Sequence, residues 1–155
     1  LEFRRVLFRA LIATGDVSDD DQLNGMGDVV VGVINAHNYS ANHDSALNKQ
    51  YVEAFKKANP GMRPNFMSVG GYDGMALIYG ALKKTGGDAN GEKLLAAMKG
   101  LAWESPRGPI SIDPDTRDIV QNIYIRKVEK VGGELYNVEF ATIPNVKDPV
   151  KAAKK

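Results

Sequence analysis

The sequence predicts a three-layer α/β protein in which helices flank a mainly parallel sheet and the chain ends in an antiparallel hairpin. Two observations predict this class. Short, continuous apolar runs, which are typical of strands buried on both faces, are interspersed with amphipathic helical patterns in the first two thirds of the chain. In the last third, two β-rich segments follow one another across the pair Gly132–Gly133, as in a tight hairpin.

Two apolar runs near the start predict the first strands. The run "ALIAT" at 10–14 ends at Gly15–Asp16, which indicates a buried strand leading into a loop. The segment "DVVVGVINA" at 28–36 is rich in valine and continuous rather than alternating. This pattern predicts a second strand that is buried on both faces, as in a parallel sheet.

The next segment carries the clearest helical signal. Either Asp44 or Ser45 can cap the helix, and Pro60–Gly61 stops it. Apolar side chains recur between these signals at helical spacing. The stripe consists of Leu47, Tyr51, Val52, Phe55 and Ala58.

A second helix is expected in the glycine-bounded stretch that follows. The run "NFMSV" at 65–69 is interpreted as a short strand, and Gly70–Gly71 as the turn after it. The helix then covers about 72–84 and is apolar over most of its circumference, which predicts a largely buried helix. It ends at Gly86–Gly87, and a third, short helix is expected at 90–100.

The C-terminal third changes to β character. Alternation predicts a strand at 108–113, and longer β-rich runs predict strands at 119–130 and 135–143 that form a hairpin around Gly132–Gly133. The remaining residues, 144–155, have the composition of a polar tail.

Composition limits the possible functions. The 155 residues are typical in number for one domain, and 20 basic against 19 acidic side chains give no electrostatic reason to expect nucleic acid as a partner. The absence of cysteine excludes disulfides, thiolate zinc sites and thiol catalysis. Residues 1–10 carry three arginines within their apolar stretch, which does not suit a signal peptide, so they are interpreted as a non-native leader.

No motif indicates an enzyme, a metal site or a cofactor. The acidic stretch at 19–25 does not continue as a calcium loop, because the twelfth position, counted from Asp20, is Val31 rather than glutamate. His37 and His43 lack a metal-binding frame, and no nucleophile motif surrounds the serine between them. Phosphate-binding glycine motifs are also absent from the sequence.

Asp16 is the best candidate for a binding residue. It follows a predicted buried strand at its carboxyl end, where ligands collect in open α/β sheets. A carboxylate at that edge suits an ammonium group. The alternative, that Asp16 is an ordinary loop or capping residue, is equally compatible with the sequence.

From about Leu11 to its end, the chain resembles the C-terminal part of the substrate-binding proteins of branched-chain amino-acid-type ABC transporters. The strongest segments are "GYDGMALIYGALKKTGG" and "ESPRGPISIDPDTRD". The resemblance implies part of a two-lobe type I periplasmic-binding-protein fold that closes on a small solute and delivers it to a membrane permease. It implies a periplasmic protein rather than an enzyme. Amino acids, amides, short-chain acids and aromatic acids all remain open as ligands.

By this resemblance, Asp16 corresponds to a carboxylate that holds the ammonium group of an amino acid. Tyr72 and Asp73 begin a core helix close to the cleft, which makes them further candidate ligand residues. The competing hypotheses are a doubly wound enzyme such as a hydrolase and a receptor-like sensing domain. The resemblance divides the chain into a second-lobe segment at 11–40, a first-lobe segment at 41–117 and second-lobe strands at 118–143.

Overall fold

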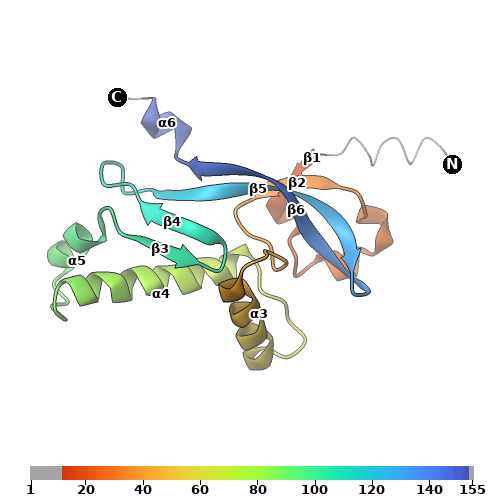
Figure 1. The fold of residues 1–155 in the computed structure, drawn as a ribbon, viewed down its shortest axis with the longest axis horizontal. Coiled ribbons are helices and arrows are strands. Elements are labelled where there is room, and N and C mark those ends of the chain that lie inside the picture. The colour runs from red at the N-terminus through yellow and green to blue at the C-terminus, as the bar shows by residue number, and fades with distance from the viewer. Residues whose placement is uncertain (1–11, 154–155) are drawn as a thin grey trace.

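The computed structural model describes residues 12–153, so the predicted leader at 1–10 lies outside the described residues. The elements in chain order are β1 (Ile12–Thr14), the 3₁₀ helix η1 (Gly15–Ser18), α2 (Leu23–Met26), η2 (Asp28–Val30), β2 (Ile34–His37), α3 (Ala46–Ala58), α4 (Phe66–Lys84), α5 (Gly91–Met98), β3 (Ala102–Ser105), β4 (Gly108–Ile112), β5 (Ile119–Val131), β6 (Glu134–Val146) and α6 (Pro149–Ala152). In Figure 1 the β5–β6 hairpin runs along the molecule, with α4 and α5 below one half and β1 and β2 at the other end.

The described strands form one mixed, open sheet with the path β1-β2-β5-β4-β3, and β6 pairs with β5. The α/β class, the flanking helices and the antiparallel C-terminal hairpin are therefore confirmed. The expectation of a mainly parallel sheet is wrong for the described residues, because only β1 and β2 pair in parallel. The turns between β3 and β4 and between β5 and β6 are two residues long, and such short connections join only antiparallel strands.

The valine-rich run does not form the strand predicted over 28–36. Gly27 and Gly32 have φ angles of +71° and +91°, which interrupt an extended backbone. The first valines instead form the 3₁₀ helix η2, and the strand begins only at Ile34. Val30 and Val33 turn inward and join the apolar core with Leu23, Val128 and Leu135.

Helix α3 confirms the prediction from its sequence signals. Ser45 is the N-cap, and its hydroxyl accepts a hydrogen bond from the backbone N–H of Asn48 at 3.0 Å. The helix ends at Ala58, immediately before Asn59 and the Pro60–Gly61 stop.

Helix α4 begins six residues earlier than expected, so the strand predicted at 65–69 is wrong. Asn65 and Ser68 form a reciprocal capping box, in which each side chain accepts a hydrogen bond from the backbone N–H of the other residue. Gly70 and Gly71 therefore lie inside a helix rather than in a turn.

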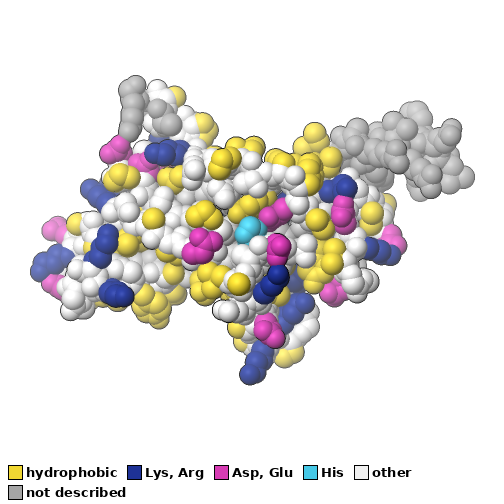
Figure 2. All heavy atoms as spheres, in the orientation of Figure 1, with side chains coloured by type: hydrophobic (Ala, Val, Ile, Leu, Met, Phe, Trp, Pro, Cys, Tyr) yellow, Lys and Arg dark blue, Asp and Glu magenta, His cyan; other side chains and the backbone are white. Residues whose placement is uncertain are grey.

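The expectation that α4 is largely buried is also wrong within the described part of the chain. Only Val69, Asp73 and Ala81 are buried among its 19 residues. Apolar side chains remain exposed along it, including Met67 at 70% and Tyr79 at 64%. Figure 2 shows hydrophobic side chains on the surface along the edge that α4 forms.

No helix among residues 12–153 combines the length and apolar character that a membrane span requires.

The C-terminal third contains one strand that the sequence did not predict, β3, which pairs with β4. The predicted hairpin is present and longer than expected, because β6 continues to Val146. Gly132 and Gly133 both have positive φ angles, as the two-residue turn requires. Within the predicted polar tail, α6 is capped by the side chain of Asp148.

Candidate functional site

The parallel strands β1 and β2 end side by side. Thr14 pairs with Ala36, so Gly15 and His37 follow at the same edge of the sheet. The contact between them is close, since a Cβ atom at Gly15 would lie 2.4 Å from the His37 side chain and 2.5 Å from the guanidinium of Arg126. Glycine at position 15 is thus required by packing, and it sets the path of the loop that carries the next residue, Asp16.

Asp16 lies in η1 with its carboxylate exposed to solvent. Its pKa is lowered by a hydrogen bond from its own backbone N–H, then by the Thr14 side chain and by the nearby His37. The pKa of His37 is lowered mainly by burial and also by the charge of Arg126. At neutral pH this edge therefore presents an ionised carboxylate beside a neutral imidazole, a pair that can accept a hydrogen bond from an ammonium or hydroxyl group.

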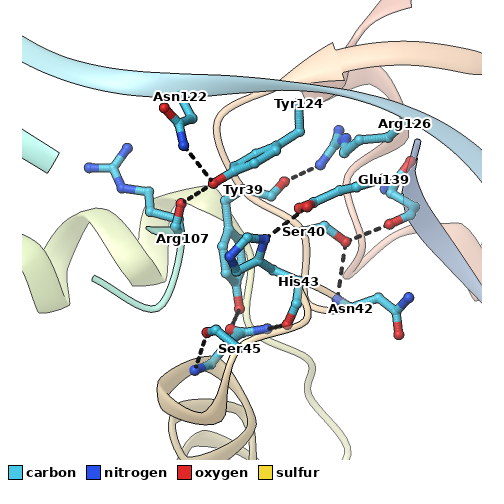
Figure 3. A network of polar contacts seen from close by, with 12 residues as sticks. Tyr39, Ser40, Asn42, His43, Ser45, Arg107, Asn122, Tyr124, Arg126 and Glu139 are labelled. Atoms are coloured by element: carbon cyan, nitrogen blue, oxygen red, sulfur yellow. Dashed lines mark hydrogen bonds and ion pairs between the residues drawn. The ribbon is translucent and has the colours of Figure 1, made fainter. Parts of the chain in front are cut away.

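The side chain of Arg126 anchors the loop that carries Asp16. This side chain is fully buried in β5, and Figure 3 shows it extending toward the backbone that follows β2. Its Nε donates to Oδ1 of Asn35 at 2.7 Å, its Nη1 donates to the carbonyl oxygen of Tyr39, and its Nη2 donates to the carbonyl oxygen of Gly15 at 3.4 Å. The position of the Gly15–Asp16 loop is consequently tied to β5.

A second polar group fastens the segment after β2 to β6. The hydroxyl of Ser40 donates to the carbonyl oxygen of Asn137 at 2.6 Å. Three residues further, Nδ1 of His43 lies 2.8 Å from Oε2 of Glu139, and the His43 ring packs against Tyr124 with centroids 5.0 Å apart. Figure 3 shows these side chains between the β strands and the start of α3.

Tyr72 lies on α4 and is 41% exposed. Its ring packs edge-on against Tyr51 of α3, with centroids 5.2 Å apart. The two helices border a groove of about 400 Å³. The residues that line it are Leu47, Gln50, Tyr51, Ala54, Phe55, Ala58, Asn59 and Tyr72. Tyr72 thus presents an aromatic surface that is open to solvent.

Asp73, by contrast, is buried at 3% exposure. Its Oδ2 accepts a hydrogen bond from Nε of Arg107 at 2.7 Å, which makes the two side chains a buried ion pair. Among the described residues no hydrogen bond or ring contact joins Asp16 to Tyr72 or Asp73. The structure therefore places the candidate residues in two separate groups. Asp16 lies with His37, and Tyr72 lies with Asp73.

Sequence reasoning did not find Arg107, Arg126 or the position of His37. The segment "PRG" around Arg107 offered a signal, because a glycine next to an arginine in a tight turn permits close packing.

Within residues 12–153 no group of three or more His, Asp or Glu side chains is arranged to hold a metal ion.

A model of the family described as periplasmic binding protein matches residues 8–133. The chain belongs to this family. It is 44% identical over 142 residues to the Leu/Ile/Val-binding protein homolog 6 of Brucella abortus, a match that covers 90% of this chain and 36% of the relative. The chain thus spans about a third of the length of the curated relatives it matches.

Solved structures agree with this family. The solute-binding protein of an ABC transporter from Rhodopseudomonas palustris BisB5, in complex with 3,4-dihydroxybenzoic acid, is 64% identical, with a TM-score of 0.89 over 96% of this chain and 42% of that one. The corresponding protein from R. palustris HaA2, in complex with p-hydroxybenzoic acid, is 40% identical, with a TM-score of 0.86 over 92% of this chain and 39% of that one. These similarities confirm the partial type I fold, and the relatives are transporter proteins rather than enzymes.

Proposed function

We propose that this chain is part of the solute-binding component of an ABC importer, located in the periplasm, and that its solute is an aromatic carboxylate of the hydroxybenzoate class. The observation that carries this proposal is the 64% identity, over 96% of the chain, to a solute-binding protein in complex with 3,4-dihydroxybenzoic acid. The protein in complex with p-hydroxybenzoic acid supports the same class at 40% identity.

The chemistry of the loop after β1 fits a hydroxylated ring. The exposed carboxylate of Asp16 is a strong acceptor for a phenolic hydroxyl, since hydrogen bonds to charged acceptors are stronger than neutral ones. The same charge repels a carboxylate, so the ligand's own carboxylate has to face away from Asp16. In p-hydroxybenzoic acid the hydroxyl and carboxyl groups lie at opposite ends of the ring, which allows this orientation.

Tyr72 supplies the aromatic part of the site. Its half-exposed ring, supported edge-on by Tyr51, offers a surface against which a benzoate ring can stack. Asp73 does not contact the solute in this proposal, because it is buried in its ion pair with Arg107. It contributes to the site through the helix that carries Tyr72. Closure of two lobes around the solute, followed by docking on a membrane permease, completes the proposed transport function.

A second candidate solute is an amino acid with an apolar side chain. The name of the 44% identical relative from Brucella abortus favours it, and the ionised, exposed carboxylate of Asp16 suits an ammonium group as well as a hydroxyl. The two candidates differ in what Asp16 binds, so ligands with and without an amine separate them.

The test uses a chimera, because the chain spans only 42% of the R. palustris BisB5 protein. The matched segment of that protein is replaced by residues 12–153 of this chain. Calorimetry then compares 3,4-dihydroxybenzoic acid, p-hydroxybenzoic acid, benzoic acid and leucine, with the unaltered R. palustris protein as the control. Hydroxybenzoates are expected to bind at least tenfold more tightly than leucine. Preferential binding of leucine would contradict the aromatic assignment and favour the second candidate.

A further inference from the structure

The turn between β3 and β4 is buried, although connections normally run over the protein surface. Ser105 is fully buried, Pro106 is less than 2% exposed and Arg107 is 6% exposed. Gly108, which begins β4, is buried as well. A turn with this environment has its conformation set by tertiary contacts.

Tyr124 of β5 fixes the backbone of this turn. Its hydroxyl donates a hydrogen bond to the carbonyl oxygen of Arg107 at 2.7 Å. Gly108 follows with a φ angle of +92°, and a Cβ atom there would lie 2.6 Å from the Tyr124 hydroxyl oxygen. Position 108 therefore requires glycine for both its backbone conformation and its contact, and the turn is held in one place against β5.

The side chain of Arg107 extends from this fixed turn to two other elements. Its Nε donates to Oδ2 of Asp73 on α4 at 2.7 Å, and its Nη1 donates to Oε1 of Gln121 on β5 at 2.5 Å. The same Gln121 oxygen accepts a hydrogen bond from Nδ2 of Asn38, the residue that follows β2, at 3.1 Å. One guanidinium thus links α4 to the strand β5 and to the end of β2.

The direction of Tyr72 depends on this link. Adjacent residues of a helix are separated by a fixed rotation, since the α-helix has 3.6 residues per turn. Fixing Asp73 in a buried ion pair therefore also fixes the direction in which the Tyr72 ring leaves the helix. Few other buried side chains restrain α4, since only Val69 and Ala81 are buried in it besides Asp73.

We infer that Arg107 is a positioning residue for the solute site, one that sets the rotation of α4 at Tyr72 relative to the strands that carry the Asp16 loop. The inference rests on the proposed function in one respect, which is that Tyr72 faces the solute. The link from Arg107 to α4 stands independently of what the solute is. Two measurements separate these two parts.

The first measurement concerns affinity in the chimera. Arg107→Gln removes the charge and the Asp73 ion pair, and it is expected to weaken binding of 3,4-dihydroxybenzoic acid by about tenfold, as for residues that modulate a site without touching the ligand. Arg63→Gln is the matched control, because the side chains of Arg63 and Arg107 are both 7% exposed, while Arg63 contacts the start of β6 and the carbonyl oxygen of Asp20 rather than α4. It is expected to lower the melting temperature while leaving affinity within about twofold.

The double variant Asp73→Asn, Arg107→Gln provides the test of mechanism. If the two residues act through one ion pair, the double variant loses no more affinity than the larger of the two single losses. Gln121→Met gives a second, milder perturbation that leaves the ion pair intact, and a loss of about threefold is expected from it. This variant keeps the inference testable if Arg107→Gln fails to fold.

The second measurement needs no ligand and uses the chain itself. Amide hydrogen exchange of the peptide that contains Tyr72 and Asp73 is expected to increase in Arg107→Gln and to remain unchanged in Arg63→Gln. Faster exchange without loss of affinity would overturn the role of Tyr72 while preserving the link to α4. Unchanged exchange at Tyr72 in Arg107→Gln, or an equal loss of affinity in both arginine variants, would overturn the positioning role of Arg107.

Discussion

Asp19 is a buried carboxyl group whose ionisation opposes folding. The residue is 2% exposed, and burial raises its pKa to about 6. The value of about 6 is the net result of this burial, of the negative charges of Asp20 and Asp21, which also raise the pKa, and of backbone N–H groups of Asp20 and Phe66, which lower it. This side chain is therefore expected to contribute a pH-dependent part of the stability of the protein.

The magnitude follows from the difference between the folded and unfolded states. An ordinary aspartate has a pKa of 3.8, and each unit of difference corresponds to about 1.4 kcal/mol, so the rise to about 6 corresponds to about 3 kcal/mol. Because the folded state binds the proton more tightly, the cost is absent below pH 3.8. It grows between about pH 4 and pH 6 and is constant above that range.

The assay compares wild type with Asp19→Asn, which carries no charge at any pH, by urea unfolding from pH 4 to pH 8. The variant's free energy of unfolding relative to wild type is expected to rise by about 2.5 kcal/mol between pH 4 and pH 7.5, since a small part of the total change lies below pH 4. Any fixed cost of the amide cancels in this comparison. Glu53→Gln changes an exposed carboxylate on α3 and serves as the control. Parallel pH curves for wild type and Asp19→Asn would refute the reasoning.

Three further substitutions test other parts of the structure. Gly15→Ala places a methyl group 2.4 Å from His37 and should lower the free energy of unfolding by about 1–3 kcal/mol, whereas Gly25→Ala, with no atom within 4 Å, should not destabilise. Ser40→Ala removes a 2.6 Å hydrogen bond to β6 and should cost about 1 kcal/mol in the same denaturant assay. Asp16→Asn in the chimera should weaken leucine binding about tenfold to a hundredfold and hydroxybenzoate binding less, while benzoate binding is unchanged or improved, as measured by calorimetry.

Local signals explain what the sequence predicted correctly. The bounds of α3 follow from a serine cap and a Pro–Gly stop, both of which act within a few residues of the helix end. The β5–β6 hairpin follows in the same way from Gly132–Gly133, whose positive φ angles are a property of the turn itself. Such features depend little on the rest of the fold.

The start of α4 was mispredicted because its local signals were ambiguous. A five-residue apolar run such as 65–69 fits a strand or the first turn of a helix equally well. The decisive feature is the capping box between Asn65 and Ser68, which uses serine at a position where glutamate or glutamine is more common. The strand predicted for the valine run at 28–36 failed for a related reason, since Gly27 before the run and Gly32 within it outweigh its β propensity.

The candidate site was predictable only where it lies at the end of a strand. Asp16 was found because it follows an apolar run, and the structure confirms a strand at Ile12–Thr14 that leads into the loop that carries it. The predicted burial of this strand is wrong for the described residues, since Ile12 is 79% exposed. The roles of Arg107 and Arg126 depend on partners 34 and 91 residues away along the chain, Asp73 and Asn35. Apart from the glycine that follows Arg107, no local pattern distinguishes these arginines from exposed ones.

The balance of buried side chains also bears on how a solute-binding protein can move. Among the described residues, thirteen buried side chains are polar or charged, as many as the apolar ones when Pro64 and Pro106 are counted with them. Hydrogen bonds and ion pairs are directional, so a structure held by them keeps a defined geometry, whereas apolar packing is non-directional. The buried contacts of Arg107 and Arg126 lie where the segments around α4, β2 and β5 meet. Under the proposed function, a junction of this composition can hold the Tyr72 and Asp16 groups in one relative position without a large apolar contact between them. Such a contact would oppose the opening that the proposed release of a solute requires.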